Sequence, residues 1–310
     1  MAIHSIGLDD FCRIWGCSPS DVPPACIAKL QALNTGHRLL TAEERDEHVL
    51  GILKRLQSPN LSRTPTENLQ AFESGWNETL QMCLLQGVSA DTLKPKYVRP
   101  YTRIRYNGDF ITPENPFLND ELLSIATSYS FRKYLAGTER IYEFGCGTGR
   151  YLFELSDIFP QKSLVGLDWT DSSKKILQRM AQTGRHVKGI HFDMLNPDND
   201  LGLKPGSAVV TIGAMEQLGD SFGPFLSYLL AQNPQIVIHH EPIKEFYDEN
   251  VLFDYLAILY HDQRRYLSGF WGALQQLAHE GRLEILDGRR LYFGDPYHES
   301  ASFIAWTPKG

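Results

Sequence analysis

IYEFGCGTGR, residues 141–150, is the stretch of sequence that decides the fold. A short apolar run ends in three glycines, and the residues that follow are typical of a helix that begins near Tyr151. In an open α/β sheet, the loop after the first strand lies at the crevice where ligands bind, and glycine lets the backbone approach a ligand closely. The stretch therefore predicts a ligand-binding turn between a parallel strand and its helix.

The glycine spacing separates the possible ligands. Dinucleotide-binding proteins use G-x-G-x-x-G, but Arg150 occupies the sixth position here. The phosphate-binding pattern G-x4-G-K-[ST] is also absent from this loop. The first absence disfavours a nicotinamide-dependent oxidoreductase, and the second disfavours a P-loop nucleotide-binding protein.

Short apolar runs alternate with helical patterns after residue 138, which predicts a parallel sheet covered by helices on both faces. The last two runs have no helix between them, so they are expected to form an antiparallel hairpin joined through Gly294-Asp295-Pro296. The sequence predicts an α/β fold with a seven-stranded, doubly wound, mostly parallel sheet and a C-terminal hairpin. The expected strands are 139–144, 163–168, 187–193, 207–213, 234–240, 283–293 and 301–307.

Residues 1–138 show helical periodicity instead. Thr41 with Glu44, and Thr64 with Glu67, both have the spacing of a capping box at a helix start. Another helix is expected from about Asn119 to Gly137. We predict an all-helical cap over 1–138 and a core domain over 139–310. A stripe at three- and four-residue spacing, assigned to the core and not to a cofactor site, consists of Leu69, Phe72, Trp76, Leu80 and Leu84.

Charge and composition exclude several classes of protein. The 310 residues include 30 basic and 37 acidic ones, giving 30 − 37 = −7, and residues 139–310 account for 16 − 22 = −6 of it. Such a chain does not attract a phosphate backbone at long range, so no nucleic-acid partner is expected. The sequence begins without a signal-peptide pattern and has no apolar run of about 18 residues, so we expect a cytoplasmic protein with no membrane partner. Its five scattered cysteines predict free thiols.

Acidic residues follow the first three strands of the predicted core. The pattern E-x-G-x-G-x-G runs from Glu143 to Gly149, Asp168 ends the next strand, and Asp193-Met194 ends the third. This combination resembles the class I S-adenosylmethionine-dependent methyltransferases over residues 139–310. The resemblance implies that S-adenosylmethionine is the cofactor, that Glu143 serves its methionine end, and that Asp168 holds the ribose hydroxyls. It implies the cofactor-binding set Glu143, Gly145, Gly147, Gly149, Asp168, Trp169, Asp193 and Met194, in which Trp169 packs beside the adenine or belongs to the core.

Candidate catalytic residues lie after the fourth and fifth strands. Met215-Glu216-Gln217-Leu218 resembles a segment found there in many small-molecule methyltransferases, although Gln217 replaces its histidine. Glu216, His240 and Glu241 remain as candidates for a base or for orienting the acceptor. Adjacent strand residues point to opposite faces, so His239 is assigned to the core and His240 to the site. We expect no metal, because such triads arise often by chance.

Residues 94–106 carry five basic residues and three tyrosines with no acid. Guanidinium groups pair with carboxylate or phosphate, so Tyr101, Arg103 and Tyr106 are candidates to bind an anionic or aromatic acceptor. The alternative is an edge loop with solvated charges. Tyr255 and Tyr260 are further candidates from a helical stripe after the fifth strand.

The sequence thus favours a methyltransferase that acts on a small-molecule acceptor by O- or N-methylation. Two alternatives stay open: an aminopropyltransferase-like enzyme that uses decarboxylated S-adenosylmethionine, and a non-catalytic methyltransferase-like binding module. The pattern specifies neither the acceptor nor an oligomeric state.

Overall fold

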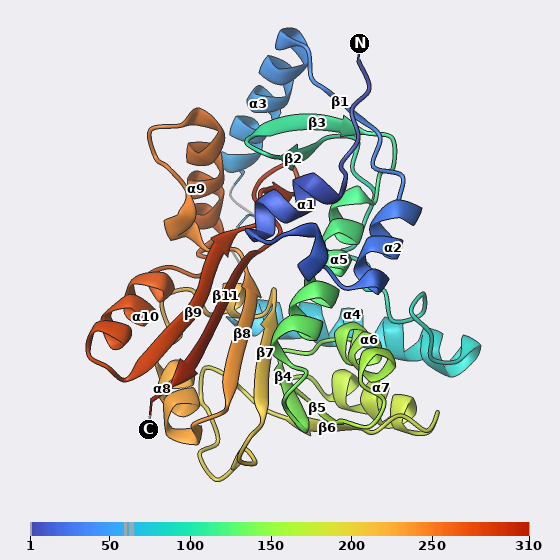
Figure 1. The fold of residues 1–310 in the computed structure, drawn as a ribbon, viewed down its shortest axis with the longest axis vertical. Helices are drawn as coiled ribbons and strands as arrows, with labels where there is room; N and C mark the ends of the chain where they lie inside the picture. Colours follow the sequence, from blue (N-terminus) through green and yellow to red (C-terminus); the bar gives the residue numbers. More distant parts are fainter. Residues whose placement is uncertain (1, 59–60, 62–64, 310) are drawn as a thin grey trace.

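A seven-stranded sheet forms the centre of the computed structural model, which describes residues 2–58, 61 and 65–309 (Figure 1). Five strands are parallel, and the sixth pairs antiparallel with both of its neighbours. This arrangement confirms the predicted sheet and its C-terminal hairpin. In spatial order the strands are β6 (Val187–His191), β5 (Ser163–Asp168), β4 (Arg140–Phe144), β7 (Ala208–Ile212), β8 (Ile236–Glu241), β11 (Ser302–Pro308) and β9 (Leu283–Arg290).

Helices cover both faces of this sheet because its central strands are apolar on both sides. Alternate residues such as Ile141 and Val210 face one set of helices, while Tyr142 and Val209 face the other. On the first face lie α1 (Leu8–Trp15), α2 (Pro24–Ala32), α5 (Leu118–Tyr134), α6 (Arg150–Ile158) and α7 (Asp171–Ala181). On the second lie α8 (Gly223–Gln232) and α10 (Phe270–His279).

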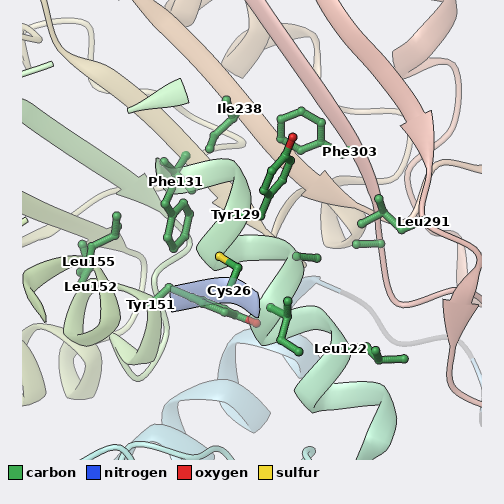
Figure 2. Packing of buried hydrophobic residues seen from close by; sticks show 14 of the residues in the cluster. Cys26, Leu122, Tyr129, Phe131, Tyr151, Leu152, Leu155, Ile238, Leu291 and Phe303 are labelled. Carbon is green, nitrogen blue, oxygen red and sulfur yellow. The ribbon is translucent and has the colours of Figure 1, made fainter. Parts of the chain in front are cut away.

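Helix α5 is the centre of the first face. Figure 2 shows its Leu122, Tyr129 and Phe131 in one cluster with Ile238 and Phe303 of the sheet. This helix was expected from the sequence between Asn119 and Gly137, and the structure places it at Leu118–Tyr134. It binds the N-terminal helices α1 and α2 to the sheet, so the first hydrophobic core includes residues from both sides of position 138.

The region before residue 138 is not all helical, which corrects the prediction of a helical cap. It contributes three strands to a four-stranded antiparallel sheet, and the fourth strand comes from the C-terminal part of the chain. Asn107 and Gly108, with φ of +51° and +83°, form the two-residue hairpin turn between two of them. Strands of two to five residues are too short to show a period. In spatial order they are β1 (His37–Leu39), β3 (Asp109–Pro113), β2 (Ile104–Tyr106) and β10 (Phe293–Gly294).

Three longer helices and three short 3-10 turns complete the fold. The capping box at Thr41 is confirmed: the Glu44 amide donates to the Thr41 hydroxyl at 3.2 Å, and the Thr41 amide donates to the Glu44 carboxylate at 2.9 Å. The second predicted box includes Thr64, which lies outside the described residues. The elements are α3 (Ala42–Leu56), α4 (Pro65–Gln86), α9 (Leu252–Arg264), η1 (Pro19–Asp21), η2 (Met215–Leu218) and η3 (Lys244–Phe246).

Helix α3 packs against α9 over a small third core that includes Ile52, Phe110 and Phe253. Among the described residues, no helix combines the length and the apolar character that crossing a membrane requires. All five cysteines are free thiols.

Candidate active site

A cavity of about 590 Å³ lies at the carboxyl ends of β4, β5 and β7. Its floor consists of the loops that follow these strands and β6, and its other walls come from α4, the segment 96–101, α9 and the segment 295–300. The volume falls within the usual range for small-molecule sites. Open parallel sheets bind ligands at this edge, so the fold places the cavity where the sequence predicts it.

The three predicted glycines are required by backbone conformation and by space. Gly145, Gly147 and Gly149 have φ of +67°, +52° and +74°, the left-handed region that disfavours other residues. A Cβ atom on Gly145 would lie 2.4 Å from the Cβ of Ala214, and one on Gly149 would lie 2.5 Å from a Leu177 methyl group. The loop therefore keeps a bare backbone between the cavity and the surrounding core.

Asp168 fastens this loop to the end of β5. Its carboxylate accepts a hydrogen bond from the Gly147 amide at 2.9 Å. The other oxygen accepts from the Thr170 amide at 3.0 Å and the Thr170 hydroxyl at 2.6 Å. Burial raises the pKa of Asp168, and these hydrogen bonds oppose that rise. The structure thus places Asp168 on the cavity wall and also gives it a local structural role.

Glu143 lies deeper in the same wall with one carboxyl oxygen unsatisfied. The side chain is 2% exposed, lines the cavity, and its Oε2 has no hydrogen-bond partner. Burial, and then the nearby Asp168, raise the pKa of Glu143 well above its ordinary value. A buried carboxyl group without a partner is costly, so this position is suited to a ligand that brings a cation or a hydrogen-bond donor.

The remaining predicted cofactor residues also line the cavity. Trp169, Asp193 and Met194 lie along the ends of β5 and β6. Asp193 is engaged locally, because its carboxylate accepts from the Leu195 amide and the Asn196 side chain, both at 2.8 Å. The structure therefore brings together all eight residues of the predicted cofactor set in and around one cavity, with Gly149 just behind its lining.

Helix α4 supplies a roof that the sequence did not predict. Phe72 stacks on Trp76 with ring centroids 5.5 Å apart, Tyr97 meets Trp76 edge-on, and all three rings line the cavity. A Cβ atom on Gly147 would lie 3.0 Å from the Trp76 ring. Trp76 and Leu80 pack in the core as predicted, and Phe72 packs against it, but Phe72 and Trp76 also line the cavity. Leu84 is 51% exposed, so its assignment to the core is wrong. Helical periodicity shows which face of the helix is covered but not what covers it.

Hydrogen bonds hold α4 and the segment after it to the sheet domain, among them one from the Asn68 side chain to the Gln217 side chain at 3.2 Å. Glu73 of α4 accepts from the Ser172 hydroxyl at 2.5 Å, at the first turn of α7. The Thr148 hydroxyl donates to the Leu93 carbonyl at 2.7 Å. Helix α4 also packs against α7 (Figure 1), and the close approach of Trp76 to Gly147 places the roof beside the glycine loop.

The far end of the cavity is aromatic and polar. Tyr260 lies 6.1 Å from Tyr266 and stacks on His298 at 5.2 Å. Tyr101 and Arg264 line the same end. Tyr101 and Tyr260 were predicted as acceptor-binding residues, whereas Tyr266, Arg264 and His298 were not. The missed residues lie in loops or at a helix end, where no pattern marks a binding residue.

Three other predicted acceptor residues do not line this cavity. Arg103 pairs with Glu47 at 2.7 Å and lines a separate groove beside Tyr101. Tyr106 is buried against His37, with ring centroids 5.5 Å apart. Tyr255 is 43% exposed on the outer side of α9. Of the basic segment 94–106, only residues 96–99 and Tyr101 line the cavity.

Of the two predicted catalytic glutamates, only Glu216 lines the cavity. Glu216 lines the cavity and accepts from the Gln217 side chain at 2.7 Å; burial, and then Glu241, raise its pKa to about 8. Glu241 is fully buried behind it and accepts from the amides of Ala214 at 3.1 Å and Glu216 at 3.3 Å. Glu241 thus shapes the turn after β7 and does not line the cavity.

His240 is part of the core, which corrects its assignment to the site. Its Nε2 lies 2.7 Å from the Ser130 hydroxyl of α5, and its ring packs 5.0 Å from Phe303. Burial lowers its pKa to about 3. Strand alternation does separate His239 from His240, but both faces of β8 are covered, so neither ring reaches the cavity. Within the described residues, no group of three or more His, Cys, Asp or Glu side chains is placed to hold a metal ion.

No protein-family model matches the sequence, and no curated protein matches it either. Solved structures do show a similar arrangement. The plantazolicin methyltransferase BpumL is 14% identical, with 60% of this chain and 81% of that chain covered and a TM-score of 0.40. The methyltransferase domain of bacterial CtHen1 is 17% identical, with 62% and 100% covered and a TM-score of 0.46. Magnesium protoporphyrin IX methyltransferase from Synechocystis PCC 6803 is 11% identical, with 62% and 84% covered and a TM-score of 0.44.

Proposed function

We propose that this protein is an S-adenosylmethionine-dependent methyltransferase that acts on a small-molecule acceptor. The observation that carries the proposal is the Glu143 carboxyl oxygen that has no hydrogen-bond partner. It lies in the same cavity wall as the glycine loop, which Asp168 holds through a hydrogen bond from the Gly147 amide. These groups fit the cofactor, because Glu143 is placed to take its ammonium group and Asp168 its ribose hydroxyls. When bound, the cofactor supplies a methyl group on a positively charged sulfur.

The residues of this chain would bind, align and shield the two reactants. The roof residues Phe72 and Trp76 exclude water above the glycine loop, and Asp193 with Met194 forms the wall on the β6 side. In-line methyl transfer needs mainly alignment, so an enclosed cavity suits this chemistry. In this proposal residues 139–310 provide most of the cofactor site, while residues 1–138 provide its roof and part of the acceptor wall.

A small molecule is the acceptor that this cavity favours. Its far end is walled by Tyr101, Tyr260 and Tyr266, with Arg264 beside them. Aromatic faces pack on planar molecules, and a guanidinium group pairs with an anionic substituent. We therefore extend the proposal to a planar or anionic metabolite. The acidic net charge agrees with a partner other than nucleic acid.

Calorimetry with S-adenosylhomocysteine tests the cofactor. We expect one molecule to bind per chain, and NAD⁺, used as the control ligand, to produce no binding heat. Absence of S-adenosylhomocysteine binding at high micromolar concentration would refute the proposal. A clear preference for decarboxylated S-adenosylmethionine over S-adenosylmethionine would instead support the aminopropyltransferase alternative.

A further inference from the structure

A second hollow, which we name the basic groove, adjoins the aromatic end of the cavity. Residues of α3, of the segment 99–103 and of the segment 296–297 line it. Among the described residues of its lining, three are arginines and a single one is acidic: Arg38, Arg99, Arg103 and Glu44. In a chain with a net charge of −7, the basic groove is a local concentration of positive charge, which favours an anionic ligand.

The basic groove and the cavity share a wall. Arg99 and Tyr101 line both of them. Tyr297 lines the basic groove and Tyr260 lines the cavity, and these two rings stack on each other with their centroids 5.0 Å apart and their planes 13° apart. One stacked pair of rings and one segment of chain therefore stand between the two hollows, so a single elongated molecule can occupy both.

Two of the three arginines are available to a ligand. Arg99 forms no ion pair with any described residue; its Nε donates to the Tyr101 hydroxyl at 3.3 Å. Arg103 pairs with Glu47 at 2.7 Å, but the Glu47 side chain is 71% exposed and does not line the basic groove. Such a surface ion pair contributes little to stability, and a guanidinium group binds a phosphate group through two parallel hydrogen bonds. A phosphate group can therefore replace Glu47 at Arg103.

The rest of the lining adds neutral groups. Arg38 and Glu44 neutralise each other through two hydrogen bonds, both at 2.7 Å. Burial, and then Arg103, lower the pKa of His48 to about 4, so this histidine is uncharged. Thr102 and Thr112 also line the basic groove, and their hydroxyls have no hydrogen-bond partner among the described residues. Free hydroxyls beside arginines are donors that suit phosphate oxygens.

We propose that the basic groove binds the phosphate group of an elongated acceptor whose planar part occupies the aromatic end of the cavity. This inference rests on the proposed function and names the acceptor class: a planar metabolite with a phosphate-bearing tail. Arg99 contacts the tail where it leaves the cavity, and Arg103 binds the phosphate group in place of Glu47. The basic groove thereby positions the acceptor and takes no part in the covalent step.

Inorganic pyrophosphate tests the basic groove by itself, by calorimetry on the free protein at low salt, where charge interactions are least screened. We expect one pyrophosphate to bind per chain, and Arg99→Gln and Arg103→Gln each to weaken it about tenfold. Glu47→Gln removes the carboxylate that competes for Arg103, so it should bind pyrophosphate about threefold more tightly. The matched control is Arg45→Gln, an exposed position of α3 that does not line the basic groove and should leave the affinity unchanged.

Riboflavin and flavin mononucleotide test the connection to the cavity, because they share a planar ring and differ by one terminal phosphate group. Fluorescence titration of the S-adenosylhomocysteine complex should show that the wild type binds flavin mononucleotide about tenfold more tightly than riboflavin. Arg103→Gln should remove most of this preference, whereas Arg45→Gln should retain it.

The inference is wrong if pyrophosphate does not bind, or if wild type, Arg99→Gln and Arg103→Gln bind it equally well. It is also wrong if the wild-type complex binds neither flavin, or binds both with equal affinity, because the basic groove would then not extend the acceptor site. The proposed function is tested separately. A chain that binds pyrophosphate in the basic groove but fails to bind S-adenosylhomocysteine refutes the proposed function itself.

Discussion

Substitution of Glu143 by Gln isolates the role of the unsatisfied carboxyl group. Glutamine has nearly the same shape but cannot become negatively charged. In the free protein, burial raises the pKa of Glu143 well above its usual value, so the native state keeps this proton where the unfolded state has lost it. Stability that depends on this group therefore falls as the pH rises above the usual glutamate pKa. Glu143→Gln removes that loss, so its melting temperature at neutral pH should equal or exceed that of the wild type.

Cofactor binding should respond in the opposite direction. The Glu143 side chain is 2% exposed, so a hydrogen bond to a cationic ligand would form there almost without competition from water. Hydrogen bonds to charged groups contribute roughly 1.5–3 kcal/mol, which corresponds to roughly a 10- to 150-fold change in the dissociation constant. Glu143→Gln should weaken S-adenosylhomocysteine binding by a factor in this range.

Calorimetry in two buffers of different ionisation enthalpy measures both the affinity and the protons released. Binding to the wild type should release protons, because the ammonium group favours the ionised form of Glu143. This proton release should disappear in Glu143→Gln. The matched control is Glu139→Gln, an exposed position just before β4, at its opposite end. Equal affinity of wild type and Glu143→Gln, or a melting temperature several degrees lower in the variant, would refute the reasoning.

Three further substitutions test the roof, the loop and the core. Trp76→Phe should weaken S-adenosylhomocysteine binding by roughly 1 kcal/mol, about fivefold, because the smaller ring loses its contact over Gly147; unchanged affinity by calorimetry would contradict this role. Gly149→Ala should lower the free energy of unfolding by about 2–5 kcal/mol, from left-handed strain plus crowding against Leu177, as measured by urea titration. Ser130→Ala should cost about 1–3 kcal/mol by leaving the His240 Nε2 unpaired; a change in cofactor affinity beyond twofold would instead restore His240 to the site.

The sheet and the floor of the site could be predicted because both depend on local sequence. Strands that are buried on both faces appear in the sequence as short apolar runs separated by helical patterns. Three close glycines, with acidic residues at successive strand ends, indicate a ligand-binding edge of the sheet. Glu143, Asp168 and Asp193 each end or follow a strand whose position was predicted correctly, so the parallel sheet brings them together. No contact between distant segments had to be known.

The roof and the acceptor end depend on such contacts. Trp76 lies on a helix whose apolar face was visible in the sequence, but its partner is a glycine 71 residues later. His298 meets Tyr260 because β10 crosses into the N-terminal sheet, and that two-residue strand leaves no periodic signal. His240 was chosen for its place at a strand end, where the cover provided by α1 and α5 could not be foreseen.

Buried polar atoms without a hydrogen-bond partner occur both in the core, as at Nδ1 of His240, and at the cavity, as at Oε2 of Glu143. His239, by contrast, is satisfied on both nitrogens, by Thr211 at 2.8 Å and Trp306 at 2.9 Å, as stability requires. Glu143 is 2% exposed and lines the cavity, yet its Oε2 has no hydrogen-bond partner. Unsatisfied groups of this kind lower the stability of the free protein, and a bound molecule would offset that cost.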